Sequence, residues 1–71
     1  MRTYKINRKF GRKLKKVRKD KELSQEQLAE MLKMSRNHFG RLEAGSVNVT
    51  LVQVERIARV LKVKPSEILP F

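Results

Sequence analysis

Cysteine and tryptophan are absent from this chain of 71 residues, which contains one histidine, three glycines and two prolines. No disulfide and no cluster of metal ligands can therefore brace the small core, so its stability has to come from side-chain packing. An apolar run of about 18 residues, as a membrane span requires, is missing too, and so is the pattern of a secretory signal. We expect one cytoplasmic domain over residues 1–71, with no metal and no cofactor.

The sequence also lacks the pattern of an enzyme. His38 is the only histidine, and no acid, base or nucleophile is spaced to work with it. A loop that could cradle a phosphate is missing as well. The sequence therefore predicts a binding protein.

Acidic residues are scarce near the N-terminus. Residues 1–21 hold eleven lysines or arginines and a single acid, whereas residues 22–71 contribute only +1 to the net charge of +11. Such a run can be a solvated face, or it can attract a polyanion that releases counterions on binding. Attachment to a membrane surface is a third possibility. The accompanying apolar stripe is narrow, however, and more simply closes the domain's own core through Ile6, Phe10, Leu14 and Val17.

Two short helices joined by a tight turn are predicted between Ser24 and Gly45. Ser24 and Gln27 form a capping-box pattern at the start of the first helix. Ser35 can cap the second helix, and Gly45 suits its C-terminal end. Ala29 provides the small side chain that two steeply crossing helices need at their closest approach. This is the layout of a helix-turn-helix DNA reader, whose second helix enters the major groove.

The outward face of the second helix is polar. Phe39 and Leu42 can face inward, which leaves Arg36, Asn37 and Arg41 on the opposite side. Arginine can bind guanine and asparagine can bind adenine through paired hydrogen bonds, each worth about 1–3 kcal/mol of discrimination. Contact with the DNA backbone, without base reading, is the alternative for these residues.

A short loop after Gly45 leads to a further helix, which Thr50 caps and which runs to about Leu61. Pro65 starts a last short helix that continues to about Leu69. The helix after Thr50 is expected to bury Leu51, Val54, Ile57, Ala58 and Leu61. Apolar residues outside that stripe suggest a dimer interface, to which we assign Val47, Val49, Val52, Ile68 and Phe71.

Four correctly spaced segments of the chain resemble the phage repressor and Cro-like (XRE-type) helix-turn-helix proteins. They are FGRKLKKVR, LSQEQLA, SRNHFGRLEAG and TLVQVERIARVLKV, within residues 10–69. The resemblance implies an all-α, five-helix repressor-like DNA-binding domain, whose helix-turn-helix consists of helices two and three. A basic N-terminal arm is expected at about residues 1–5. Small restriction-modification controller proteins are the most similar, in length and in the phrase INRKFGRKLKK.

The resemblance also implies roles for individual residues. The base-reading positions are occupied by Ser35, Arg36, Asn37 and Arg41. Phosphate contacts are expected from Gln25, His38, Ser46 and Asn48. Exposure to solvent without a DNA contact is the alternative for Gln25, and a contact at the rim of the interface is the alternative to a phosphate contact for His38. A largely buried ion pair between the first helix and the recognition helix falls on Arg18 and Glu43, whose role is stability.

Three residues depart from the family's pattern. Lys33 stands in the turn where glycine is common, so it is expected either to adopt a left-handed conformation or to remodel the turn. Gly40 lies inside the recognition helix, which reflects either close approach of a partner or of DNA, or simple tolerance. His38 replaces a small hydroxyl residue. Outside the motif, Gly11 is expected to permit close packing or to loosen the start of the first helix.

The predicted function is a sequence-specific, DNA-binding transcriptional regulator that binds double-stranded DNA as a homodimer on a palindromic operator. An autoregulating controller of a restriction-modification system is favoured, with an antitoxin or phage repressor as the alternative. No membrane and no small-molecule effector is expected as a partner. A basic module that binds RNA or an acidic protein is the rival from another class. Tyr4 is the only aromatic residue outside the expected core and C-terminal cluster, which counts against stacking on RNA.

Overall fold

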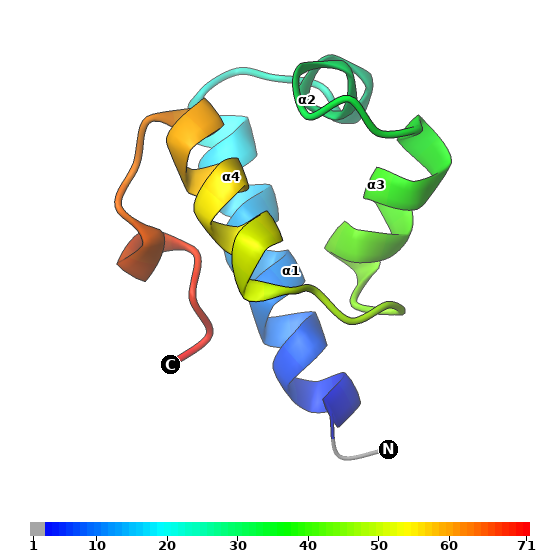
Figure 1. Cartoon of the computed structure of the whole chain (residues 1–71), viewed down its shortest axis with the longest axis vertical. Coiled ribbons are helices and arrows are strands. Elements are labelled where there is room, and N and C mark those ends of the chain that lie inside the picture. Colours follow the sequence, from blue (N-terminus) through cyan, green and yellow to red (C-terminus); the bar gives the residue numbers. More distant parts are fainter. Residues whose placement is uncertain (1–2) are drawn as a thin grey trace.

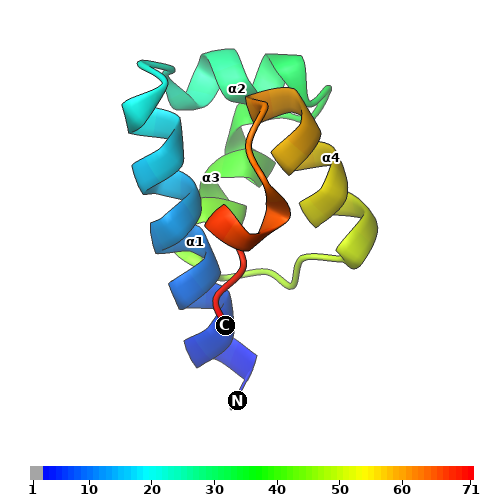
Figure 2. The same cartoon turned by 90° about the vertical axis from the view of Figure 1, so that its left-hand side faces the viewer.

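Four α-helices and one 3₁₀ turn form the fold in the computed structural model, which describes residues 3–71 (Figure 1). They are α1 (Thr3–Asp20), α2 (Gln25–Met31), α3 (Arg36–Ala44), α4 (Leu51–Leu61) and the 3₁₀ turn η1 (Pro65–Glu67). Helix α3 packs against both α1 and α2. The segment from η1 to the C-terminus lies between α1 and α4 (Figure 2). No strand occurs in residues 3–71, so the all-α class is confirmed.

Both ends of the chain differ from the prediction. The fifth predicted helix is only the 3₁₀ turn η1, because the chain turns inward after it and buries Ile68 in the core. Pro70 lacks the N–H group that a further helical turn would use. At the other end α1 already begins at Thr3, so residues 3–5 are helical and do not form an arm. The remainder of that predicted arm, residues 1 and 2, lies outside the described part of the chain.

The predicted N-caps of α2, α3 and α4 are confirmed. Ser24 accepts a hydrogen bond from the Gln27 N–H, and the Gln27 side chain accepts one from the Ser24 N–H. Thr50 and Gln53 form the same reciprocal pair at the start of α4. The Ser35 side chain accepts a hydrogen bond from the N–H of His38, the third residue of α3, at 3.0 Å. These local bonds satisfy helix-end donors and fix where the helices begin.

Each α-helix is followed by a residue with a left-handed backbone, and three of the four are not glycine. These residues and their φ angles are Glu22 (60°), Lys33 (58°), Gly45 (80°) and Lys62 (60°). The next amide bonds back to a carbonyl five residues earlier, at 3.0 or 3.1 Å in every case, which is the Schellman arrangement. Lys33 thus adopts the left-handed conformation rather than remodelling the turn. After the three non-glycine caps the chain places an apolar residue against the core: Leu23, Met34 and Val63.

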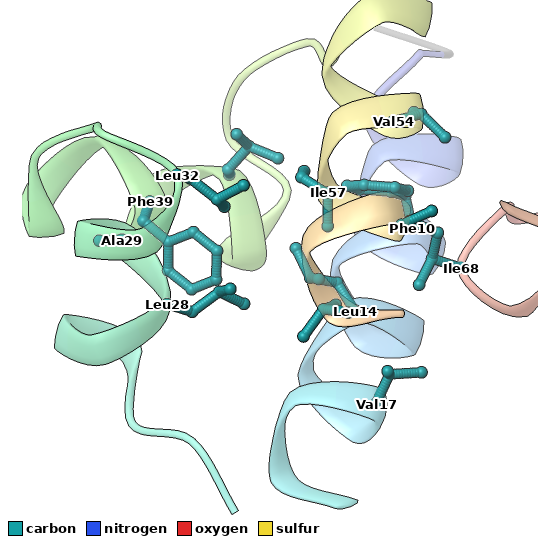
Figure 3. Packing of buried hydrophobic residues seen from close by; sticks show 13 residues of the cluster. Phe10, Leu14, Val17, Leu28, Ala29, Leu32, Phe39, Val54, Ile57 and Ile68 are labelled. Carbon is teal, nitrogen blue, oxygen red and sulfur yellow. The ribbon is translucent and has the colours of Figure 1, made fainter. Parts of the chain in front are cut away.

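Thirteen buried apolar side chains form a single core (Figure 3). In Figure 3, Phe39 of α3 points into the same space as Leu28 and Leu32, and Phe10 and Leu14 of α1 face it from the other side. The complete set is Phe10, Leu14, Val17, Leu28, Ala29, Leu32, Phe39, Leu42, Val54, Ile57, Ala58, Leu61 and Ile68. No helix in the described part of the chain is both long and apolar enough to cross a membrane.

Three apolar residues lie elsewhere than expected. Ile6 is 46% exposed, because the inward face of α1 continues through Asn7 instead. Leu51 is 81% exposed, because it is the first residue of α4 and the buried stripe of that helix begins one turn later, at Val54. Ile68 has no exposed surface, so its assignment to a dimer interface is wrong. It is part of the core of its own chain.

Candidate nucleic-acid interface

Exposed polar side chains cover the outer face of α3. Arg36, Asn37 and Arg41 are exposed, whereas Phe39 and Leu42 on the same helix are buried. The side chains of these three polar residues form no hydrogen bond or ion pair with another residue in the range 3–71. Their donors are therefore available to a ligand. Guanidinium and amide groups are the side chains that bind base edges or phosphates in a groove.

Ser35 has a structural task at the start of this face. Its hydroxyl oxygen accepts a hydrogen bond from the His38 N–H, and the hydroxyl proton of Ser35 remains available for donation. His38 is half-buried on the first turn of α3. Both residues therefore lie at the N-terminal end of the exposed surface.

A buried ion pair connects α3 to α1. Arg18 Nε lies 2.7 Å from Glu43 Oε2, and a second guanidinium nitrogen lies 3.2 Å from Oε1. The third nitrogen donates to the Leu23 carbonyl at 2.7 Å. The two side chains are only 8% and 3% exposed. The pair is bidentate and its geometry fixes the position of α3 relative to α1.

Gly11 permits the close approach of α1 to α3. A Cβ atom at this position would overlap the Glu43 carbonyl group and lie 2.7 Å from its carbon. Only a glycine therefore allows the two backbones to touch here. Gly40 differs, because the nearest atom to a Cβ there would be Gln25 Oε1, at 3.9 Å. No contact within the described residues therefore requires a glycine at position 40.

The side chains predicted to contact phosphates are partly engaged within the protein. Gln25 Nε2 donates to Glu43 Oε1 at 2.7 Å, so Gln25 belongs to the ion-pair network. The amide and the hydroxyl of Ser46 both donate to the Arg41 carbonyl, at 3.0 and 3.1 Å. Ser46 would have to rotate before its hydroxyl could donate to DNA. Asn48 uses only its oxygen, so the donors of its amide group remain available.

Asn7 is a residue that the sequence reasoning missed. It is 6% exposed on α1, and its amide donates to Asn48 Oδ1 at 2.8 Å. This bond attaches the loop between α3 and α4 to the first helix. The spacing of Asn7 could have predicted its burial, because it lies three residues before Phe10 and seven before Leu14, on the inward face of α1. A polar residue there needs a partner.

Comparison with known proteins identifies the family. Residues 9–71 match the family described as a helix-turn-helix domain. This chain belongs to that family. The control protein C.MunI of a Mycoplasma species is 42% identical over 64 residues, which cover 89% of this chain and 86% of that protein. The control protein C.BamHI of Bacillus amyloliquefaciens is 36% identical over 63 residues, 87% of this chain and 78% of its own length.

A solved structure supports the same relationship for this helix-turn-helix protein. The crystal structure of the restriction-modification controller protein C.AhdI from Aeromonas hydrophila matches with a TM-score of 0.81 and 39% sequence identity. The match covers 87% of this chain and 94% of that one. The similarity to controller proteins expected from the chain length and the phrase INRKFGRKLKK is therefore confirmed. The family consists of regulators rather than enzymes.

An apolar surface of this helix-turn-helix protein is formed by residues outside α3. We call Ile6, Leu51, Val52 and Phe71 the apolar face; their exposed fractions are 46%, 81%, 74% and 85%. Ile6, Leu51 and Phe71 line one groove together with Val49 and Leu69. Val47 and Val49, assigned to the dimer interface from the sequence, are partly buried and pack against the core. Contiguous exposed apolar residues of this kind are typical of interaction surfaces.

Proposed function

We propose that this chain is a sequence-specific, DNA-binding transcriptional regulator that controls a restriction-modification system, including its own expression. Two named control proteins among its relatives, and the similarity to the C.AhdI structure, favour this role over that of an antitoxin or phage repressor. The regulator would act on cytoplasmic double-stranded DNA.

The observation that carries the proposal is the division of α3 into two faces. Its inner face is held by core packing and by the bidentate contact of Glu43 with Arg18. Its outer face presents Arg36, Asn37 and Arg41 with free donors. A rigid helix with unengaged donors is what base reading in the major groove requires.

The charge distribution supports a polyanionic partner. Residues 1–21 carry eleven of the eighteen lysines and arginines, with Asp20 as the only acid. Two surface ion pairs, Lys16 with Asp20 and Arg59 with Glu55, engage only two of the exposed cations in residues 3–71. Apart from Lys13, which donates to the Leu69 carbonyl, most of the other exposed cations are available to neutralise phosphates, so binding should weaken steeply as salt rises.

A symmetric dimer is the second part of the proposal. One recognition helix reads only a few base pairs, so two copies on a palindromic site would provide the required specificity. The occupant we assign to the apolar face is a second copy of this chain. Leu51 and Val52 at the start of α4 and the C-terminal Phe71 would form its centre, since they are the most exposed apolar residues described.

Selection of bound sequences from random double-stranded DNA tests the function. We expect a palindromic consensus whose half-sites are about 34–36 Å apart. Arg36→Ala, Asn37→Ala and Arg41→Ala should each relax the preference at a position in both half-sites if the residue reads a base. A residue that contacts only phosphate should instead weaken binding to all sequences alike.

Arg59→Ala is the matched control, because it removes one exposed arginine that lies on α4, outside α3, and that is already paired with Glu55. It should leave the consensus unchanged. Equal affinity for the selected duplex, an unrelated duplex and RNA would contradict the proposed function and favour a general basic module. A selected sequence absent from the region upstream of the chain's own gene would contradict autoregulation.

A further inference from the structure

Arg8 crosses the C-terminal end of the recognition helix. A Cβ atom on Gly45 would lie 2.6 Å from Arg8 Cγ and 2.7 Å from Arg8 Cα, so the backbone after α3 touches Arg8 directly. Gly45 has φ of 80°, which also favours glycine. The same residue thus ends α3 and makes room for an arginine from α1.

The side chain of Arg8 borders a hollow that opens to solvent. Arg8, Ala44, Gly45 and Ser46 line it. Arg8 is exposed and has no ion-pair partner within residues 3–71. Its guanidinium group is therefore free to bind an anion that enters the hollow.

This hollow continues the outer face of α3. Asn37, Arg41 and Ala44 are spaced i, i+4 and i+7, so they share one side of the helix. All three are exposed, and Ala44 also lines the hollow beside Arg8. DNA that lies against Asn37 and Arg41 would therefore pass close to Arg8.

Further cations of α1 follow Arg8 along the same flank. Arg8, Arg12, Lys15 and Lys19 recur at spacings of four, three and four, and all are exposed. Gly11, which touches α3 at Glu43, lies three residues after Arg8 and four before Lys15, so it borders this row on the helix surface. The stripe therefore runs along the side of α1 that adjoins the recognition helix.

We propose that Arg8 binds a DNA backbone phosphate at the C-terminal end of α3, an inference that rests on the proposed function. This contact would come from outside the helix-turn-helix motif. The hollow admits the phosphate, and the guanidinium group donates to its oxygens. The contact carries no base preference, since a phosphate is present at every position. It adds affinity for selected and unrelated DNA alike.

Salt titrations of Arg8→Ala test this contact. The probes are two fluorescein-labelled duplexes of equal length, one carrying the selected sequence and one unrelated. Lys9→Ala is the matched control, because it removes a neighbouring exposed cation from a different side of α1. We expect Arg8→Ala to weaken binding to both duplexes roughly three- to tenfold near 0.1 M salt. The slope of log affinity against log salt should fall by about 0.9, as for the loss of one phosphate.

Two results would overturn the assignment. An unchanged salt slope with a lowered melting temperature would show that Arg8 only stabilises the C-terminal end of α3. Equal slope changes for Arg8→Ala and Lys9→Ala would show diffuse attraction without a defined site. A wild-type protein that does not prefer the selected duplex would instead contradict the proposed function. The Arg8 contact could still be tested in that case, because it is measured on the unrelated duplex as well.

Discussion

Individual glycines of this chain have different structural roles, and substitution should separate them. Gly11→Ala would place a Cβ atom against the Glu43 backbone, which cannot move without shifting α3. We expect a loss of about 1–3 kcal/mol in the free energy of unfolding, as for an overpacked core. Gly40→Ala meets only a side-chain oxygen at 3.9 Å and should gain about 0.5–1 kcal/mol, because alanine suits a helix interior better. Urea denaturation followed by circular dichroism gives both values, and effects of the same sign would contradict the interpretation.

Glu43 provides a second prediction at this scale. Glu43→Ala would leave the Arg18 guanidinium buried without its carboxylate, and would also remove the acceptor of Gln25. Breaking such a buried pair costs about 3–5 kcal/mol, a large share of the stability of a small domain. Glu55→Ala is the control, since its partner Arg59 is exposed and surface pairs contribute less than about 1 kcal/mol. A Glu43→Ala variant that melts at the wild-type temperature would show that the pair is not needed for stability.

At the scale of whole elements, the left-handed residues that follow the helices offer a route to higher stability. Glu22 combines two unfavourable features, a left-handed backbone and a negative charge near the C-terminal end of α1. Glu22→Gly should remove both and raise the free energy of unfolding by about 1–2 kcal/mol. Thermal unfolding would then shift upward by roughly 4–8 °C per kcal/mol in a domain of this size.

Glu22→Ala separates the two contributions. It removes the charge but keeps a Cβ atom on the left-handed backbone, so it should gain only about 0.3–1 kcal/mol. Equal stability of the glycine and alanine variants would show that the backbone conformation costs nothing there.

The starts of the helices were the most predictable part of the fold. Ser24, Ser35 and Thr50 bond to amides within the next few residues, so the signal is contained in a short stretch of sequence. The polar outer face of α3 was predictable for a similar reason, since helical spacing separates it from Phe39 and Leu42.

The ends of elements were harder to predict, because burial there depends on distant segments. Ile6 and Leu51 lie on terminal turns of α1 and α4, where no neighbouring segment covers them fully. Ile68 is buried only because the C-terminal segment folds back between α1 and α4. Lys13 of α1 donates to the Leu69 carbonyl at 2.7 Å and helps hold that segment, a contact across 56 positions that no local pattern reveals.

For the whole molecule, size and surface are compatible with a pair of copies on one face of DNA. The domain measures 30 × 25 × 20 Å, so two neighbours could place their α3 helices about one helical turn apart. The apolar face provides the contact in this proposal, while exposed cations of α1 such as Arg8 and Arg12 remain available to DNA.

Association should therefore be sensitive to charge on the apolar face. We expect Val52→Glu to weaken self-association at least tenfold in sedimentation equilibrium, because a carboxylate would have to lose its hydration in the interface. Unfolding of the monomer should change little, since Val52 is 74% exposed. Met31→Glu is the control, an exposed apolar residue on α2 outside the apolar face. Equal effects of the two substitutions, or a wild-type protein that remains monomeric at millimolar concentration, would contradict the assigned surface.

The division of α3 into an anchored face and a free face has a consequence for the evolution of specificity. Arg36, Asn37 and Arg41 support no other part of residues 3–71, so mutation can replace them without changing core packing or the ion pair. In the proposed function, stability and sequence preference would then be inherited almost separately. New operator preferences would arise by exchanging a few outward side chains, while the scaffold that presents them stays the same.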